Sequence, residues 1–145
     1  GCVVLDKQGN LTAGTSTGGM FKKRWGRIGD SPVIGAGTYA DNNSCAVSCT
    51  GHGEYFIRHA VAFDVCARYK YLKESVEKAA DYIIHTELNT NAGNGGLIAV
   101  DKLGNIAMPY NSGGMFRGFL YKEKGRPEIK KGCGIGKKIV VVGEK

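Results

Sequence analysis

The 145-residue chain is 42% apolar and 23% charged, which excludes an intrinsically disordered protein and predicts one globular domain with a real core. No apolar run approaches the roughly 20 residues of a membrane span, so a membrane partner is not expected. The formal net charge of +7 raises the question of a nucleic-acid partner, and the answer depends on where the charges lie.

The first predicted element is a hairpin. In "CVVLDKQGNLTAGTST", residues 2–17, β-forming residues stand on both sides of the turn pair Gly9 and Asn10. The hairpin ends in three hydroxyl residues, Thr15, Ser16 and Thr17. These would place a hydroxyl near the start of the first strand, and ordinary β-propensity is the alternative explanation for them.

A loop with an unusual charge pattern follows. In "GRIGDSP", Arg27 and Asp30 are three positions apart, and each directly follows a glycine. An arginine binds a carboxylate bidentately and an aspartate accepts hydrogen bonds from an ammonium, so the pair matches the head group of an α-amino acid. The alternative is a salt bridge within the loop, with Pro32 fixing the turn.

A buried strand is expected at residues 44–50, and "TGHGE" carries it into a tight turn at Gly51 and Gly53 that opens a helix. Backbone N–H groups at such a helix start point outward, where they can bind an anion or a developing oxyanion. Thr50 adds a hydroxyl at the strand end. Glycines that merely allow the turn geometry are the alternative.

Two helices are predicted next. From Glu54 the apolar residues follow a helical period, and the expected buried face is formed by Ile57, Val61 and Val65, flanked by Ala60 and Ala67. The second helix begins at about Ser75, with its buried side formed by Val76, Ala79, Ala80, Ile83 and Ile84.

Residues 97–111 repeat the design of the first hairpin, with Asp-Lys-x-Gly-Asn between apolar strands in both copies. Two copies predict two similar hairpins rather than a repeat array. A last pair of strands is expected at residues 115–121 and in "KIVVV" of the tail. Two helices cover one face of one sheet, yet "CVVL", "GLIAV" and "CAVSC" read as strands buried on both faces. We therefore expect a partner chain to cover the remaining apolar surface.

The positive charge is concentrated at one end. Residues 122–145 hold eight Lys and Arg against three Glu, which gives this segment +5 and leaves +2 for the rest. The segment lacks interleaved aromatic residues and any nucleic-acid-binding motif. We expect a solvated extension, partly strand or disordered, and no nucleic-acid partner.

Neither the cysteines nor the histidines have the spacing of a metal site. The five cysteines are Cys2, Cys45, Cys49, Cys66 and Cys133, and they predict buried free thiols in a reducing compartment, which favours the cytoplasm. The three histidines are His52, His59 and His85. His59 and His85 fall in the predicted helices, and His52 is expected to be structural more often than a substrate contact. No metal ligand is predicted.

The motifs "TSTGG", "GRIGDSP", "GAGTYADN" and "TGHGE", in this order and spacing, resemble the β chain of the plant-type L-asparaginase and isoaspartyl peptidase family of N-terminal-nucleophile hydrolases. The resemblance runs from Gly1 to about Arg117. It implies an α+β fold, a four-layer αββα sandwich, in which residues 1–121 are the β-subunit part of one domain and residues 122–145 are an extension.

The resemblance also implies roles for six residues in the hydrolysis of L-asparagine or β-aspartyl dipeptides. Thr17 would hydrogen-bond the hydroxyl of an N-terminal Thr nucleophile, whose own α-amine serves as base. An oxyanion hole would be formed by Thr50 and the Gly51 N–H, and the substrate head group would be held by Arg27, Asp30 and Gly53. The family's β chain begins Thr-x-Gly and Gly1 aligns with that Gly, so the nucleophile belongs two positions before Gly1.

The implied partners are the α chain of the same precursor and a second such heterodimer, giving an (αβ)2 assembly. No organic cofactor is implied, and a structural alkali-metal ion would have its site on the α chain. Two alternatives stay open. Glycosylasparaginase, of the same superfamily, shares "GRxGDSP", and a protein with no nucleophile would bind aspartate without hydrolysing an amide.

Overall fold

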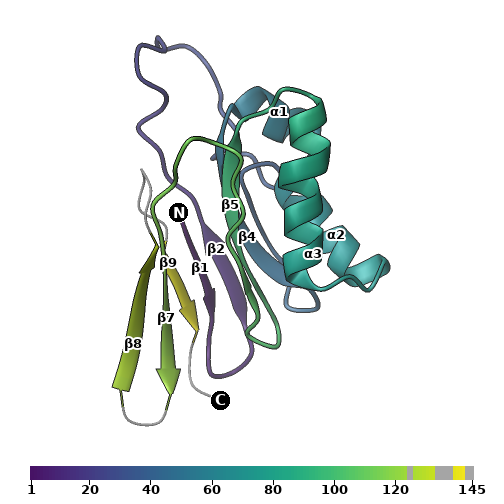
Figure 1. Cartoon of the computed structure of the whole chain (residues 1–145), viewed down its shortest axis with the longest axis vertical. Coiled ribbons are helices and arrows are strands. Elements are labelled where there is room, and N and C mark those ends of the chain that lie inside the picture. Colours follow the sequence, from purple (N-terminus) through teal and green to yellow (C-terminus); the bar gives the residue numbers. More distant parts are fainter. Residues whose placement is uncertain (124–125, 133–138, 143–145) are drawn as a thin grey trace.

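The computed structural model describes residues 1–123, 126–132 and 139–142, and arranges them in three layers (Figure 1). The middle layer is a four-stranded sheet in the order β3-β4-β5-β6, with bounds Thr38–Ala40, Cys45–Gly51, Gly95–Asp101 and Ile106–Ala107. An outer layer is a five-stranded sheet in the order β2-β1-β9-β7-β8. Its bounds, in the same order, are Leu11–Gly14, Cys2–Leu5, Ile139–Val142, Arg117–Glu123 and Arg126–Gly132.

Helices form the third layer, on the opposite face of the four-stranded sheet (Figure 1). They are α1 (Gly53–Arg58), α2 (Val61–Tyr71), α3 (Val76–Tyr82) and a π-helical turn, η1 (Ile83–Leu88), that continues α3. No helix in the part of the chain that the structure describes has both the length and the apolarity to cross a membrane.

Both predicted hairpins are confirmed, and their turns use the same hydrogen bonds. In the β1–β2 turn, the Asp6 carboxylate accepts from the Asn10 backbone N–H at 2.7 Å and from the Asn10 amide at 2.8 Å. In the β5–β6 turn, Asp101 accepts from the Asn105 N–H at 2.9 Å and from its amide at 2.8 Å. The shared motif therefore encodes a turn in which the Asp carboxylate accepts a hydrogen bond from the backbone N–H of the Asn four residues later.

The predicted strand at residues 44–50 is β4, and its two faces serve two different cores. Because side chains alternate along a strand, Cys45, Val47 and Cys49 point into the core beneath α2 and α3. Ala46 points into a second core between the sheets, which also contains Val3, Leu5, Leu11, Ile98 and Val100.

The single helix predicted from Glu54 is wrong, because the chain breaks into α1 and α2 at Ala60, whose φ is +45°. The N–H groups that open α2 bond to a distant loop, Ala62 to the Ala36 carbonyl at 3.1 Å and Phe63 to the Gly35 carbonyl at 2.8 Å. The break turns Ile57 out of the core, against our prediction, and leaves it 38% exposed.

The second predicted helix is confirmed. Ser75 caps α3 by accepting a hydrogen bond from the Lys78 N–H at 3.2 Å, and the side chains expected on the core side are all fully buried, namely Val76, Ala79, Ala80, Ile83 and Ile84. The free thiols of Cys45, Cys49 and Cys66 are buried as expected, and Cys2 is only half-buried, against the prediction. Cys133 lies outside the described residues.

The outer sheet differs from the prediction in two respects. The "CVVL" strand is buried on one face only, because Val3 and Leu5 face the other sheet while Cys2 and Val4 are half-buried. The tail contributes β8 and β9, of which only β9 was expected, and β9 pairs in parallel with both β1 and β7. The division of the chain at residue 121 stays a prediction.

Candidate active site

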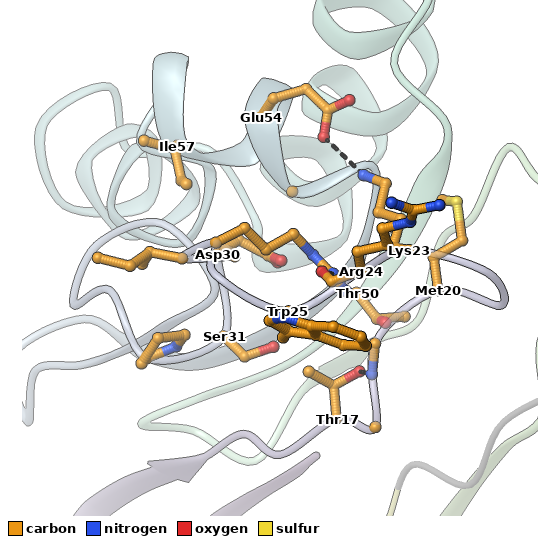
Figure 2. A pocket seen from close by; sticks show the side chains of 18 of the residues that line it. Thr17, Met20, Lys23, Arg24, Trp25, Asp30, Ser31, Thr50, Glu54 and Ile57 are labelled. Carbon is orange, nitrogen blue, oxygen red and sulfur yellow. Dashed lines mark hydrogen bonds and ion pairs between the residues drawn. The ribbon is translucent and has the colours of Figure 1, made fainter.

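The six residues with predicted roles all line one open pocket of about 900 Å³, at the end of β4 where α1 begins. They are Thr17, Arg27, Asp30, Thr50, Gly51 and Gly53. Residues 17–32, which follow β2, form its other wall (Figure 2). The structure therefore brings two motifs together that are more than twenty residues apart in the sequence.

Asp30 is the most enclosed polar residue of the pocket, at 6% exposure. Two glycines make room for it. A Cβ on Gly53 would lie 2.8 Å from Asp30 Oδ1 and 3.0 Å from its backbone nitrogen, and a Cβ on Gly37 would meet the Asp30 carbonyl. The Asp30 carbonyl also accepts from the N–H groups of Val33 at 3.0 Å and Gly37 at 3.1 Å. The backbone of Asp30 is thus held by hydrogen bonds, and Gly53 leaves room directly beside its carboxylate.

Arg27 is exposed, and its guanidinium lies against the backbone of two earlier residues of its loop. Its Nη1 donates to the Arg24 carbonyl, and its Nη2 lies so close to Gly19 that a Cβ there would be 2.5 Å away. The φ of Gly19 is +82°, so this approach depends on glycine for two reasons. The remaining guanidinium donors are suited to a carboxylate.

Thr50 and Thr17 bring two hydroxyls to the pocket from opposite sides. Thr50 shares a face of β4 with Ala46 and Ser48, so its side chain is on the side of the five-stranded sheet. Thr17 lies beyond the end of β2, and its Oγ1 accepts a hydrogen bond from the Gly19 N–H at 3.0 Å. A reacting carbonyl between them would meet hydroxyls from both walls.

Gly1, directly before β1, lies against β4 and the end of β2. A Cβ on Gly1 would collide with Ser48 Oγ and would lie 3.3 Å from the Gly14 carbonyl. The Thr15 hydroxyl joins the two walls here, because it contacts Ser48 Oγ at 2.7 Å and donates to the Gly37 carbonyl at 3.0 Å. Of the three hydroxyls that end the first hairpin, Thr15 is thus structural and Thr17 lines the pocket.

The pocket is also lined by residues that were not predicted as site residues, among them Lys23, Glu54 and Trp25. Lys23 Nζ lies 3.5 Å from Glu54 Oε2, which links the loop to α1 (Figure 2). A hydrogen bond from its own backbone N–H, followed by the charge of Lys23, holds the pKa of Glu54 below its usual value. Trp25 is 93% exposed. Trp25 follows three basic residues and directly precedes the GRIGDSP motif, and this position was the available signal.

None of the three histidines lines the pocket. His52 stacks beside Tyr55, with ring centroids 6.3 Å apart, while His59 and His85 contact Glu87 and Asp81 at 3.2 and 2.8 Å. Among the residues that the structure describes, no group of three or more His, Cys, Asp or Glu side chains is arranged to hold a metal ion. The polar groups that line the pocket include the Thr17 and Thr50 hydroxyls, the Arg27 guanidinium and the Asp30 carboxylate.

Residues 1–128 match the family model described as Asparaginase. The isoaspartyl peptidase of Salmonella typhimurium is 53% identical over 121 residues, 83% of this chain and 39% of that protein. The isoaspartyl peptidase of Escherichia coli is 48% identical over 135 residues, 86% of this chain and 42% of that protein. The plant-type L-asparaginase of Pyrobaculum calidifontis is 42% identical over 132 residues, with shares of 89% and 43%. The chain thus spans about two fifths of the length of these relatives.

Proposed function

The chain belongs to the asparaginase family, and from that membership we propose that it is the β-chain part of an amidohydrolase acting on L-asparagine and β-aspartyl dipeptides. The observation that carries the proposal is the convergence of all six motif residues on one pocket. A fold alone would not support a reaction, because function resides in the site.

In this proposal, Arg27 and Asp30 bind the two charges of the aspartyl head group. The Arg27 guanidinium takes the α-carboxylate in a bidentate pair, and the buried Asp30 carboxylate accepts from the α-ammonium. Gly53 permits the ammonium to approach, since it lies directly against Asp30. With the head group fixed, the side-chain amide reaches towards Thr50 and Thr17.

The register of β1 supports the position of the nucleophile. Cys2 pairs with Gly14 and Val3 with Ala13, so continuing the ladder two steps before Gly1 leads to a position opposite Thr17. On the second wall, Gly1 lies against Ser48. The next residue on the same face of β4 is Thr50. A threonine two positions before Gly1, where the family's Thr-x-Gly places it, would therefore stand between the two hydroxyls.

The reaction then has two steps. The nucleophile's hydroxyl loses its proton to the α-amine and its oxygen bonds to the amide carbonyl carbon, while Thr50 and the Gly51 N–H stabilise the oxyanion. The C–N bond breaks, and the nitrogen leaves with that proton as ammonia or as the amine of an amino acid. Water next attacks the β-aspartyl ester, which releases aspartate and restores the hydroxyl.

We further propose the assembly that the family resemblance implies. An α chain of the same precursor would add a second helical layer to the outer sheet, completing the αββα sandwich, and two such units would pair. Val4 and Cys2, half-buried on the outer face of β1, are compatible with such a cover. A cytoplasmic location, an alkali-metal ion on the α chain and the absence of an organic cofactor stay predictions.

The direct test offers the full-length protein three substrates: L-asparagine, β-aspartyl-leucine and glycosylated asparagine. We expect release of aspartate from the first two. Turnover of glycosylated asparagine alone would instead make the protein a glycosylasparaginase. Binding of aspartate with no turnover of any substrate would make it an aspartate-binding protein.

A Thr50→Val variant tests the oxyanion assignment. We expect kcat to fall about 10²- to 10³-fold, the usual cost of removing one oxyanion donor, with L-aspartate affinity retained. Thr12→Val is the matched control, because Thr12 is exposed on β2 and does not line the pocket. Equal rates for the two variants would remove Thr50 from the mechanism.

A further inference from the structure

We propose that Arg24 and Trp25 form a leaving-group subsite that selects β-aspartyl dipeptides with a free C-terminal carboxylate and an apolar second side chain. Arg24 would bind that carboxylate, and the Trp25 indole would pack on that side chain. This inference rests on the proposed function, because it concerns the part of the substrate that departs when the amide is cleaved.

The size of the pocket is the first observation. Its volume of about 900 Å³ lies near the top of the roughly 300–1,000 Å³ range typical of sites for drug-sized ligands. Asp30, one of the two proposed head-group residues, accounts for one side of it. In Figure 2, Asp30 and Ser31 lie to the left of Trp25, while Met20, Lys23 and Arg24 lie to its right. This second side is lined by side chains that asparagine alone does not need.

The second observation is the pairing of the loop's cations. Residues 22–27 contain Lys22, Lys23, Arg24 and Arg27. Lys23 is taken by Glu54 at 3.5 Å, and Arg27 is tied to the Arg24 carbonyl and assigned to the head group. Lys22 does not line the pocket. Within residues 1–123, the Arg24 guanidinium has no ion-pair partner, so it is the pocket cation that remains for a second carboxylate.

The third observation is the apolar surface beside this cation. Trp25 is 93% exposed and Met20 is 43% exposed, and both line the pocket. Apolar area that stays in water in the free chain is a source of binding energy once a ligand covers it. A tryptophan offers a large flat face at little cost in conformational entropy. The departing residue's side chain is the part of a dipeptide that could cover it.

Arg24 and Trp25 make different demands on the leaving group. An indole face accepts many partners, whereas a guanidinium in a pocket distinguishes a carboxylate from a neutral group of the same shape. Ammonia, the leaving group of asparagine, would contact neither residue. A dipeptide with a free C-terminal carboxylate would contact both residues. The same dipeptide with its C-terminal carboxylate replaced by an amide would lose only the contact with Arg24.

The test compares Arg24→Gln with Lys22→Gln, which removes the same charge from the same loop outside the pocket. The substrates are β-aspartyl-leucine, β-aspartyl-leucinamide and L-asparagine, hydrolysed by the full-length protein. We expect Arg24→Gln to lower kcat/KM for β-aspartyl-leucine by about 10-fold, and to change the other two by less than about 2-fold. Equal effects on the acid and the amide, or the same loss with Lys22→Gln, would overturn the subsite.

Binding gives a readout that does not depend on turnover. Trp25 is the only tryptophan among the 145 residues, so its emission, taken as the difference from a Trp25→Phe variant, reports on the subsite. If the protein hydrolyses none of the three substrates, the proposed function fails. In that case β-aspartyl-leucine is not consumed and can be used as a ligand in binding measurements. We expect it to shift the emission to shorter wavelength, and Arg24→Gln to weaken its binding about 10-fold. An identical shift with L-aspartate, or unchanged affinity in Arg24→Gln, would contradict the inference.

Discussion

The two faces of strand β4 differ in composition and in what they contact. On the helix side, Cys45, Val47 and Cys49 are apolar and completely buried. On the other side the residues become more polar towards the end of the strand, from Ala46 through the buried Ser48 to the half-buried Thr50. One face packs wholly into the helix-side core, whereas the other packs into the core between the sheets at Ala46 and brings a hydroxyl to the pocket at Thr50.

Such a division lets a site be strained or polar without unfolding the protein. The helix-side core is closed by α2, α3 and η1, and it does not depend on the loop of residues 17–32. Pocket residues can therefore be changed with little loss of stability, whereas helix-side residues cannot. Three variants test how sharp this division is.

Phe56→Ala should give the largest effect. Phe56 is fully buried in the helix-side core, so its truncation should lower the free energy of unfolding by about 3–5 kcal/mol. Ile57→Ala is the control, because Ile57 follows Phe56 directly but lines the pocket. Its truncation should lower the free energy of unfolding by less than about 1 kcal/mol. Urea unfolding of both variants measures the difference. Similar losses of unfolding free energy would mean that the pocket side contributes as much to stability as the helix-side core does.

Gly53→Ala should have an intermediate effect, because it changes the pocket side by overpacking. The new Cβ would lie 2.8 Å from Asp30 Oδ1, so either the carboxylate or α1 must shift, at a cost of about 1–3 kcal/mol. We expect weaker L-aspartate binding as well, measured by calorimetry. Gly14→Ala meets no atom within 4 Å and should leave both quantities unchanged.

Asp41→Asn should give the smallest effect, at the rim of the helix side. The Asn43 backbone N–H, and then Lys70 at 2.9 Å, hold the pKa of Asp41 below its ordinary 3.8. A lowered carboxyl pKa stabilises the fold above pH 3.8, and this contribution disappears as the pH falls through the folded-state value. Asp41→Asn should thus lower the urea midpoint slightly at pH 7 and leave it unchanged in acid.

Asp64 provides the control of opposite sign for this pH dependence. Burial raises the pKa of Asp64, so its ionisation opposes folding as the pH rises through that value. Asp64→Asn should therefore raise the urea midpoint at pH 7 relative to Asp41→Asn. Two variants with the same midpoint shift at pH 7 would show that neither carboxyl acts through its charge.

Local patterns predicted those parts of the fold whose hydrogen bonds are local. Asp6 and Asp101 each bond a residue four positions on, so the motif Asp-Lys-x-Gly-Asn contains everything that its turn requires. The break at Ala60 could not be found in this way. It depends on carbonyls of residues 35 and 36, which lie more than twenty positions earlier and whose place beside the helix is set by tertiary packing.

The site was predictable for a similar reason, and only in part. Arg27, Asp30 and Thr50 stand in short motifs whose residue types already suggest their chemistry, and the structure brings them into one pocket. The space around Asp30 was missed, because Gly37 acts on it from seven positions away. Trp25 was passed over because an exposed aromatic residue has no meaning until its neighbours are known.

The position of β1 also bears on the order in which the chain folds. Its backbone pairs with β2 on one side and with β9 on the other, and the second ladder joins Cys2 to Ile139, which are 137 positions apart (139 − 2). Contacts of such long range are formed late and slowly. On a ribosome, the strand that leads into the pocket would wait for residues 139–142 to emerge before its second edge is closed. The position of β1 beside the pocket would then be secured later than that of β4, which carries Thr50 and pairs with β3 and β5.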